Sequence, residues 1–238
     1  MKTELLYLSD SQIFETHGAI LEIHQDSKGF YFILDKTIFY PQGGGQASDT
    51  GSISFTSGES AEVYHVACVE DKVHHYVKED PRHLKVGTLG LMSVDKERRL
   101  LNTRSHSAGH LLGHIFEQLH PQSKAVKGHH FPGECYVEFL FPKETPGQDL
   151  TIINKAIEEV IGKDLSSKTF LVEKEAIIAL NLPYEIQTNK PLRVHEINDY
   201  KPIPCGGTHV KSLQEIGKII VTKVKVKGDR IKVSYEIG

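Results

Sequence analysis

The hydrophobic residues between positions 19 and 94 occur in short runs separated by glycine, aspartate and other turn-forming residues. The runs are rich in β-branched and aromatic side chains, which is typical of strands rather than helices. Short strands at this spacing predict a small antiparallel β-barrel. The expected strands cover residues 19–24, 29–35, 51–55, 61–69, 72–77 and 86–94.

The pattern changes to helical spacing at Asp95. Apolar side chains recur every three or four residues up to His120, acidic residues lie in the first turn, and Pro121 ends the segment. We therefore expect a helix over residues 95–120. Its apolar positions are Leu100, Leu101, Ala108, Leu111, Leu112, Ile115, Phe116 and Leu119.

The remaining chain mixes strands and helices. Helices are predicted at 150–161 and 174–180, and strands at 136–141, 168–173, 192–197, 216–226 and 230–237. The last two strands form a hairpin. The fold class is therefore α+β. We expect a barrel domain over residues 1–92, followed by a domain over residues 93–238 whose helices pack on an antiparallel sheet.

Composition limits the class of protein. The net charge of −3 argues against a protein that coats nucleic acid indiscriminately, although a local basic surface is still compatible with binding one folded RNA. No apolar run approaches the roughly 20 residues of a membrane span, and the first residues lack the apolar core of an export signal. Three cysteines are too few for a disulfide framework. We expect a cytoplasmic protein with no membrane partner.

Two short motifs contain the residue types of a metal site. His106-Ser-Ala-Gly-His110 places two imidazoles one helical turn apart, and Cys205-Gly-Gly-Thr-His209 lies in a Pro- and Gly-rich segment. Zinc accepts cysteine sulfur and histidine nitrogen together in tetrahedral geometry. We therefore expect His106, His110, Cys205 and His209 to hold one zinc ion. The alternative is a helix with polar histidines and an unrelated cysteine in a turn.

Neighbouring residues refine this prediction. Ser107 stands where a zinc protease of the HExxH class needs a glutamate base, which argues against that class. His114 is in register with His106 and His110 and is a third candidate to reach the ion. We expect it instead to support the ion indirectly or to be half-exposed. Spacing assigns no role to His129 or His130.

Two further segments are candidates for substrate binding. Three glycines in a row within the segment from Phe39 to Gly51 carry a large ordering cost, which favours close approach of the backbone to a ligand or a neighbouring domain over a plain surface hairpin. Lys223, Lys225 and Lys227 alternate with valines and share one strand face. They are either contacts for RNA phosphates or the solvated side of a sheet.

Together, Arg104-Ser-His-Ser-Ala-Gly-His-Leu-Leu, Pro204-Cys-Gly-Gly-Thr-His-Val and Phe39-Tyr-Pro-Gln-Gly-Gly-Gly-Gln-Ala-Ser-Asp-Thr-Gly resemble the alanyl-tRNA editing family. That family comprises the editing domain of alanyl-tRNA synthetase and its free-standing AlaX relatives. The motif order matches over nearly the whole chain. The resemblance implies zinc-assisted hydrolysis of the ester joining serine or glycine to alanine tRNA, without ATP.

The resemblance also implies roles for individual residues. His106, His110, Cys205 and His209 match the zinc positions, and the glycine-rich motif, with Gly43, Gly44, Gly45 and Gln46, would face the editing pocket. Two departures are visible. Ser107 replaces the usual threonine but keeps the hydroxyl, and the stretch from Val126 to His129 lacks a glutamine found in the synthetase editing domains.

The expected mechanism is attack of a zinc-polarised water on the ester carbonyl. A pocket that hydrogen-bonds the serine hydroxyl would reject alanine, and Thr208 and Thr37 are the expected partners, with Ser107 as the third hydroxyl of the site. Four protein ligands would fill a tetrahedron, so we expect His209 to be loosely held, the ion to become five-coordinate, or the ion to orient substrate only.

Three other functions remain open at this point. The helix motif is also similar to that of the threonyl-tRNA synthetase editing domain, which would act on serine-charged threonine tRNA. A non-catalytic tRNA-binding module with a structural zinc would bind RNA without deacylation. A general metal-dependent esterase would cleave small esters without RNA.

Overall fold

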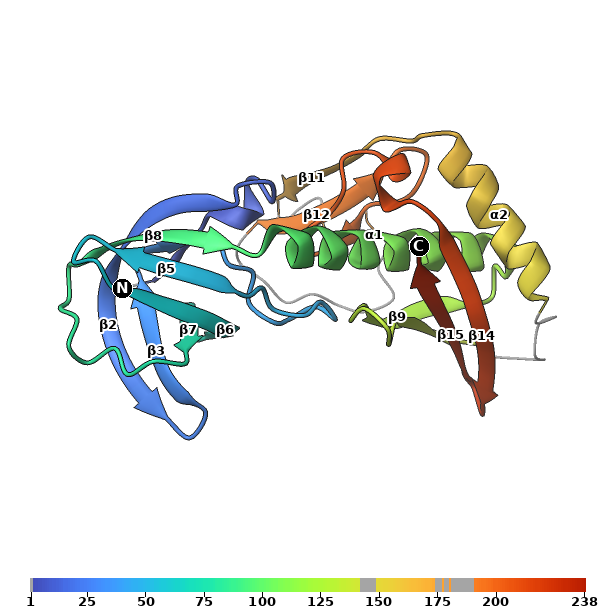
Figure 1. The fold of residues 1–238 in the computed structure, drawn as a ribbon. Coiled ribbons are helices and arrows are strands. Elements are labelled where there is room, and N and C mark those ends of the chain that lie inside the picture. Colours follow the sequence, from blue (N-terminus) through green and yellow to red (C-terminus); the bar gives the residue numbers. More distant parts are fainter. Residues whose placement is uncertain (1, 142–148, 174–176, 178–179, 181–190) are drawn as a thin grey trace. The chain divides into compact units, whose positions relative to one another are not determined.

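A computed structural model of the protein describes residues 2–141, 149–173, 177, 180 and 191–238. The chain divides into two compact units, Met1–Leu101 and Asn102–Gly238, which are described separately here (Figure 1). The helix predicted at 174–180 lies largely outside the described residues. No helix in the described part of the chain combines the length and the hydropathy needed to span a membrane.

The first unit is a closed antiparallel barrel of six strands, as the sequence predicts. In spatial order these are β2 (Glu15–Asp26), β3 (Gly29–Leu34), β7 (Lys72–Val77), β6 (Ser60–Val69), β5 (Gly51–Phe55) and β8 (Leu89–Val94), and β8 pairs with β2 to close it. Side chains alternate between the two faces of each strand, and the apolar ones fill the barrel interior. These apolar side chains are fully or almost fully buried. They include Ile20, Phe32, Ile53, Val63 and Met92.

The hydrophobic pattern of the sequence does not predict three short elements of the first unit. β1 (Glu4–Leu5) pairs in parallel with β4 (Lys36–Thr37), and a 3₁₀ turn, η1, covers Leu6–Leu8. Strands of two residues are too short to show an alternation of apolar and polar positions. Their pairing depends on the long-range fold and not on local sequence.

A buried ion pair ties the end of the glycine-rich segment to the first turn of α1 (Lys96–Leu119) within the first unit. Arg99 Nε donates to both carboxylate oxygens of Asp49 at 3.0 Å, and both side chains are fully buried. Arg99 also donates to the carbonyl of Ser11 at 2.8 Å. Asp49 accepts the backbone N–H of Tyr40 at 2.6 Å. Each charge is therefore satisfied inside the unit, as buried charges must be.

The second unit contains most of α1, a second helix and two antiparallel sheets. One sheet has the order β14 (Ile219–Lys227), β15 (Arg230–Ile237), β10 (Tyr136–Leu140) and β9 (Lys124–His129). The other has the order β11 (Ser167–Val172), β12 (Leu192–Ile197) and β13 (Ile203–Pro204), and η3 (Leu213–Ile216) precedes β14. Helix α2 (Leu150–Gly162) begins at Asp149, whose carboxylate accepts the N–H of Thr151 at 2.8 Å.

The apolar side of α1 packs against one face of the four-stranded sheet. Phe116 of the helix meets Phe139 of β10 with ring centroids 4.3 Å apart. Val233 and Ile231 of β15 belong to the same buried cluster, as does Ile157 of α2. The α+β class is therefore confirmed.

The sequence does not predict strand β9, because Lys-Ala-Val-Lys-Gly-His is largely polar. The division of the chain into two compact units falls between residues 101 and 102, inside α1. The domain boundary expected between residues 92 and 93 stays a prediction.

Candidate metal centre

The four expected metal ligands converge in the second unit. His106 Nε2 lies 3.1 Å from Cys205 Sγ and 3.2 Å from His110 Nε2. His209 Nε2 lies 3.2 Å from the same sulfur. The four donor atoms all lie within 4.8 Å of one another, so these side chains can hold one metal ion.

Local structure explains the convergence. His106 and His110 are four residues apart on α1, which places both rings on one face of the helix. Cys205 and His209 follow β13 in a loop, where the N–H of Gly207 points to Cys205 Sγ at 3.3 Å. A Cβ at Gly206 would meet no atom within 4 Å, so sterics do not require this glycine for the loop to fold.

The donor set and its spacing fit a tetrahedral ion. Donor atoms of a zinc ion with bonds of about 2.0–2.3 Å lie about 3.3–3.6 Å apart. The nearest distances here, 3.1 Å and 3.2 Å, are slightly shorter. One sulfur and three imidazole nitrogens are borderline-soft ligands, which favours zinc over magnesium or calcium.

Burial determines the protonation states of the four side chains when no metal ion is bound. It lowers the pKa of His106, His110 and His209 well below the ordinary value, so each imidazole is neutral and has a lone pair to give. Burial also raises the pKa of the Cys205 thiol to about 11. A thiolate there therefore needs a cation, because a bound metal deprotonates its thiol ligand.

Ser107 contacts the site through His209. Its Oγ lies 3.5 Å from His209 Nδ1 and accepts the N–H of Val210 at 3.1 Å. A contact at Nδ1 favours the tautomer in which Nε2 carries the lone pair. The structure thus places Ser107 behind His209, one of the four candidate ligands.

Replacing Ser107 by alanine is expected to lower metal affinity by about 10- to 100-fold, because the ring of His209 loses the hydroxyl that orients it. Competition with a chromophoric chelator measures this. Ser105→Ala is the matched control, since Ser105 lies on the same helix and its Oγ has no hydrogen-bond partner among the described residues. Equal affinities for the two variants would contradict the assigned role.

Arg193 of β12 hydrogen-bonds to the loop that contains Cys205 and His209. Its guanidinium donates to the carbonyls of Cys205 at 2.7 Å and Gly207 at 3.0 Å, and its own carbonyl accepts the N–H of Cys205 at 3.0 Å. Sequence reasoning missed this residue. No spacing rule connects an arginine in a strand to carbonyls twelve or more residues later.

Two further histidines surround the site. His130 is buried, its ring lies 4.8 Å from that of His106, and its Nδ1 is 2.7 Å from the hydroxyl of Tyr235. Tyr235 donates that hydroxyl proton to the carbonyl of Ser105 at 2.7 Å. His130 is therefore the donor to Tyr235 and carries its proton on Nδ1. Glycines at 109 and 128 leave room for this ring, since a Cβ at either would lie 2.1 Å or 2.3 Å from it.

His195 of β12 stacks on His209 with ring centroids 3.5 Å apart and an interplanar angle of 7°. Burial lowers its pKa to about 3. Neither ring nitrogen has a hydrogen-bond partner among the described residues. His195 belongs to no recognisable motif, so sequence reasoning does not select it.

His114 departs from expectation in part. It is only 8% exposed, so the prediction that it is half-exposed is wrong. Its ring packs 4.9 Å from that of Tyr200, and burial lowers its pKa to about 4. Its place one helical turn beyond His110 puts it in the apolar body of the unit, outside the group of four donors.

The glycine-rich segment forms a tight turn in the first unit. Gly43 and Gln46 exchange backbone hydrogen bonds of 3.2 Å and 2.8 Å around Gly44 and Gly45, whose φ angles are 54° and 77°. Two central residues with positive φ make a type I′ turn, which accounts for two of the three glycines. Gly43 and Gly44 are exposed, Gly45 is half-buried and Gln46 is buried. Their contact with substrate stays a prediction.

The predicted hydroxyl and lysine residues occupy different environments. Thr37 is fully buried in the barrel, with its Oγ1 2.7 Å from His75 Nε2. Thr208 is fully buried within the loop between Cys205 and His209, with its Oγ1 2.7 Å from that of Thr103. Lys223 and Lys225 are exposed on β14. Only Thr208 and Ser107 are brought next to the four donors, and the roles of all these residues stay predictions.

Two known protein families match parts of the chain, and one match includes residues of the candidate metal centre. Residues 7–98 match the family described as tRNA synthetases class II (A). Residues 192–232, which include Cys205 and His209, match the second additional domain of threonyl and alanyl tRNA synthetases.

Relatives match over all or nearly all of the chain. The alanyl-tRNA editing protein AlaX-M of Saccharolobus solfataricus is 31% identical over 99% of both chains. The AlaX-M protein of Pyrococcus horikoshii is 32% identical over 91% of this chain and 89% of its own length. An alanine–tRNA ligase of Methanopyrus kandleri is 28% identical over all of this chain, which spans only 26% of the ligase. The chain therefore belongs to the AlaX-M family of alanyl-tRNA editing proteins.

Proposed function

We propose that the protein is a zinc-dependent deacylase that hydrolyses the ester of mischarged alanine tRNA in trans, with serine or glycine as the amino acid removed. The observation that carries this proposal is the convergence of one thiol and three imidazoles in a chain of the AlaX-M family. The partner is the acceptor end of alanine tRNA, where the amino acid is attached.

Zinc is the proposed ion, bound by His106, His110, Cys205 and His209. When bound, it supplies Lewis-acid polarisation and stabilises negative charge on oxygen. The sulfur and nitrogen donors support this choice, as does the thiol of Cys205, whose raised pKa makes an unpaired thiolate costly.

The chain's own residues would position the substrate. His110 and Cys205 are the partly exposed members of the group, while His106 and His209 are buried. The aminoacyl ester would therefore approach on the side of His110 and Cys205. His209 is held by Ser107 and is not the accessible member, which argues against His209 as the loose ligand.

A single assay separates this function from its rivals. The protein is incubated with serine- and alanine-charged alanine tRNA and with serine-charged threonine tRNA, with and without chelator. We expect rapid loss of serine from alanine tRNA only, and no loss after chelation. Preference for threonine tRNA would indicate a threonyl-type editor, and tRNA binding without hydrolysis would indicate a structural module. Cleavage of small esters alone would indicate a general esterase.

The hydroxyl of Thr208 is the proposed partner for the serine hydroxyl. Thr208→Val is expected to narrow the preference for serine over alanine by roughly fivefold, because about 1 kcal/mol of hydrogen bonding is lost for serine only. The ratio of kcat/KM for the two charged tRNAs measures this. Thr103→Val is the control, since it removes the 2.7 Å partner of Thr208 and keeps its hydroxyl. An unchanged ratio for Thr208→Val would remove the residue from this role.

A further inference from the structure

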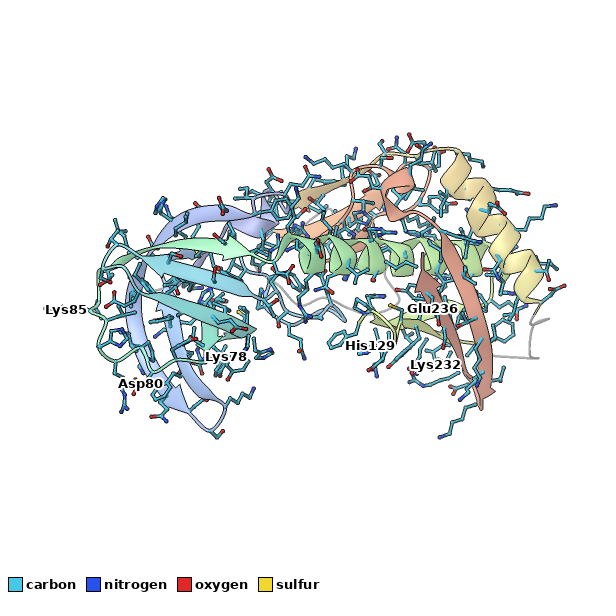
Figure 2. All side chains as sticks on the ribbon, in the orientation of Figure 1. Lys78, Asp80, Lys85, His129, Lys232 and Glu236 are labelled. Atoms are coloured by element: carbon cyan, nitrogen blue, oxygen red, sulfur yellow. The ribbon has the colours of Figure 1, made fainter. Side chains whose placement is uncertain are left out.

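The face of the four-stranded sheet that points away from α1, here called the outer sheet face, is strongly basic. On β14 it carries Lys223, Lys225 and Lys227, which alternate with the inward-facing Val224 and Val226. A bulge between Val221 and Lys223 sets this register. In Figure 2, the side chain of Lys232 points away from the sheet on the side opposite α1.

Cross-strand pairing extends the basic face over the whole sheet. Lys225 lies opposite Lys232, and Lys227 lies opposite Arg230. Across β10, Glu138 separates Lys232 from Lys127 of β9. Like charges placed directly opposite each other on neighbouring strands are destabilising, so folding alone does not favour this arrangement.

Few acidic groups neutralise this face. Within the described residues, three carboxylates lie on or beside this face: Glu138, 3.8 Å from Arg230, Glu134, 3.6 Å from His129, and Glu236 near the end of β15. The three lysines of β14 form no ion pair among the described residues. The chain as a whole carries a net charge of −3, so the positive charge is concentrated locally. A local patch of this kind governs association with a polyanion more than the total charge does.

Aromatic rings lie beside the lysines. His129 stacks on Tyr136 with centroids 5.2 Å apart and on Phe131 with centroids 4.3 Å apart. Lys232 Nζ lies 3.4 Å from the centre of the Tyr136 ring, and Lys127 Nζ lies 5.9 Å from it. All three rings are half-buried, so part of each faces solvent. Lysines interleaved with stacked aromatic rings are typical of surfaces that bind single-stranded nucleic acid.

A second stack of aromatic rings lies on the barrel, but the charges beside it are different. It consists of His24, Tyr31 and His74, and the rings of Tyr31 and His74 are centred 4.2 Å apart. That stack is flanked by Glu22 and Asp26, whose pKa values are lowered by hydrogen bonds to neighbouring side chains or backbone, so both stay ionised at neutral pH. Lys72, the lysine beside this stack, is paired with Glu22, whereas the lysines and the arginine of the outer sheet face outnumber its carboxylates. A phosphate backbone is therefore attracted to the outer sheet face more than to the ring stack of the barrel.

We propose that the outer sheet face binds the RNA chain of the tRNA, with the lysines of β14 on successive phosphates and Tyr136 stacking on an unpaired base. This rests on the proposed function, which makes a tRNA the substrate. Lysines two residues apart on a strand are about 6.6–6.8 Å apart, which suits neighbouring phosphates of one strand. A base that stacks on Tyr136 displaces Lys232, which then reaches a phosphate.

RNA fits this face better than other anionic partners. A membrane surface would be bound by the charges alone and would leave the flat aromatic stack unused. An acidic protein would require matching carboxylates but no stacking of flat bases. The pairing of a phosphate-spaced lysine row with stacked rings selects a nucleic acid chain.

Binding of uncharged alanine tRNA between 50 and 200 mM salt tests the proposal. The variant Lys223→Gln/Lys225→Gln/Lys227→Gln is expected to bind at least about tenfold more weakly at low salt. Its slope of log affinity against log salt should be smaller by about 2 to 3, because three phosphate contacts are lost. The control variant Lys78→Gln/Lys85→Gln/Lys155→Gln removes three exposed lysines elsewhere and should keep the wild-type slope.

The variant Tyr136→Leu tests the contribution of base stacking to tRNA binding without changing the charge of the face. It is expected to weaken binding by about tenfold at every salt concentration and to leave the slope unchanged, since stacking releases no counterions. Tyr64→Leu, on the barrel, is its control. A wild-type slope and affinity in the lysine variant would overturn the proposal. Binding of the wild type to anionic lipid vesicles that depends on the same lysines, with tRNA affinity unaffected, would also overturn it.

The assay uses uncharged tRNA so that the two proposals can fail separately. Intact tRNA binding without ester hydrolysis would contradict the proposed function and support the outer sheet face. Hydrolysis of charged tRNA with unaltered binding by the lysine variant would support the function and refute the face.

Discussion

Replacing Cys205 by serine is expected to abolish stable metal binding and to lower the deacylation rate of serine-charged alanine tRNA by at least about 100-fold. The sulfur is the only soft donor of the group, and it lies 3.1–3.2 Å from two of the imidazole nitrogens. A serine hydroxyl at this position cannot ionise to replace a thiolate. Metal content by mass spectrometry under native conditions and single-turnover deacylation measure the two effects.

Cys68→Ser is the matched control for Cys205→Ser. Cys68 is an exposed cysteine of β6 and is not one of the four donors, so this variant should keep both metal and activity. Full deacylation by Cys205→Ser after removal of all bound metal would contradict the proposed role of the thiol. Circular dichroism of both variants checks that the fold is retained.

Replacing Arg99 by methionine is expected to lower the free energy of unfolding by about 3–5 kcal/mol. The change leaves the Asp49 carboxylate buried without its counter-charge, and an uncompensated buried charge costs this much. Urea denaturation measures the loss. The effect on folding should exceed that of any exposed substitution in the barrel unit, because both partners have no solvent exposure.

Arg98→Met tests whether the Arg99 effect belongs to the buried pair. Arg98 precedes Arg99 on α1, but it is exposed and makes a hydrogen bond of 3.0 Å to the carbonyl of Ser48. It should cost less than about 1 kcal/mol. A double variant, Asp49→Asn with Arg99→Met, should recover part of the loss because no lone charge remains. A loss for Arg99→Met as small as that for Arg98→Met would contradict this account.

Local patterns predicted most of the fold. Strands over residues 51–55, 72–77, 192–197 and 230–237 are observed with the predicted bounds. Their apolar residues alternate or their ends are marked by turn residues, so local sequence is sufficient. β9 was missed because its two lysines read as a loop, and it is held in place by pairing with β10. Such pairing is a long-range effect that single-sequence reasoning does not capture.

The sequence predicts only those residues of the candidate site that belong to motifs with a recognisable spacing. Two motifs with donors four residues apart identified His106 and Cys205 with their partners. The surrounding side chains, Arg193, His130 and His195, come from elements far apart in the sequence and belong to no motif. Asp49 was noticed only as part of a glycine-rich segment, and its ionic partner fifty residues later had no sequence signal.

The most direct measurement for the whole account is a zinc titration of metal-free protein, with deacylation of serine-charged alanine tRNA followed at each step. The account predicts activity that rises in proportion to bound zinc and reaches its maximum at one ion per chain. Full activity in the metal-free protein, or no activity at one bound ion per chain, would contradict it.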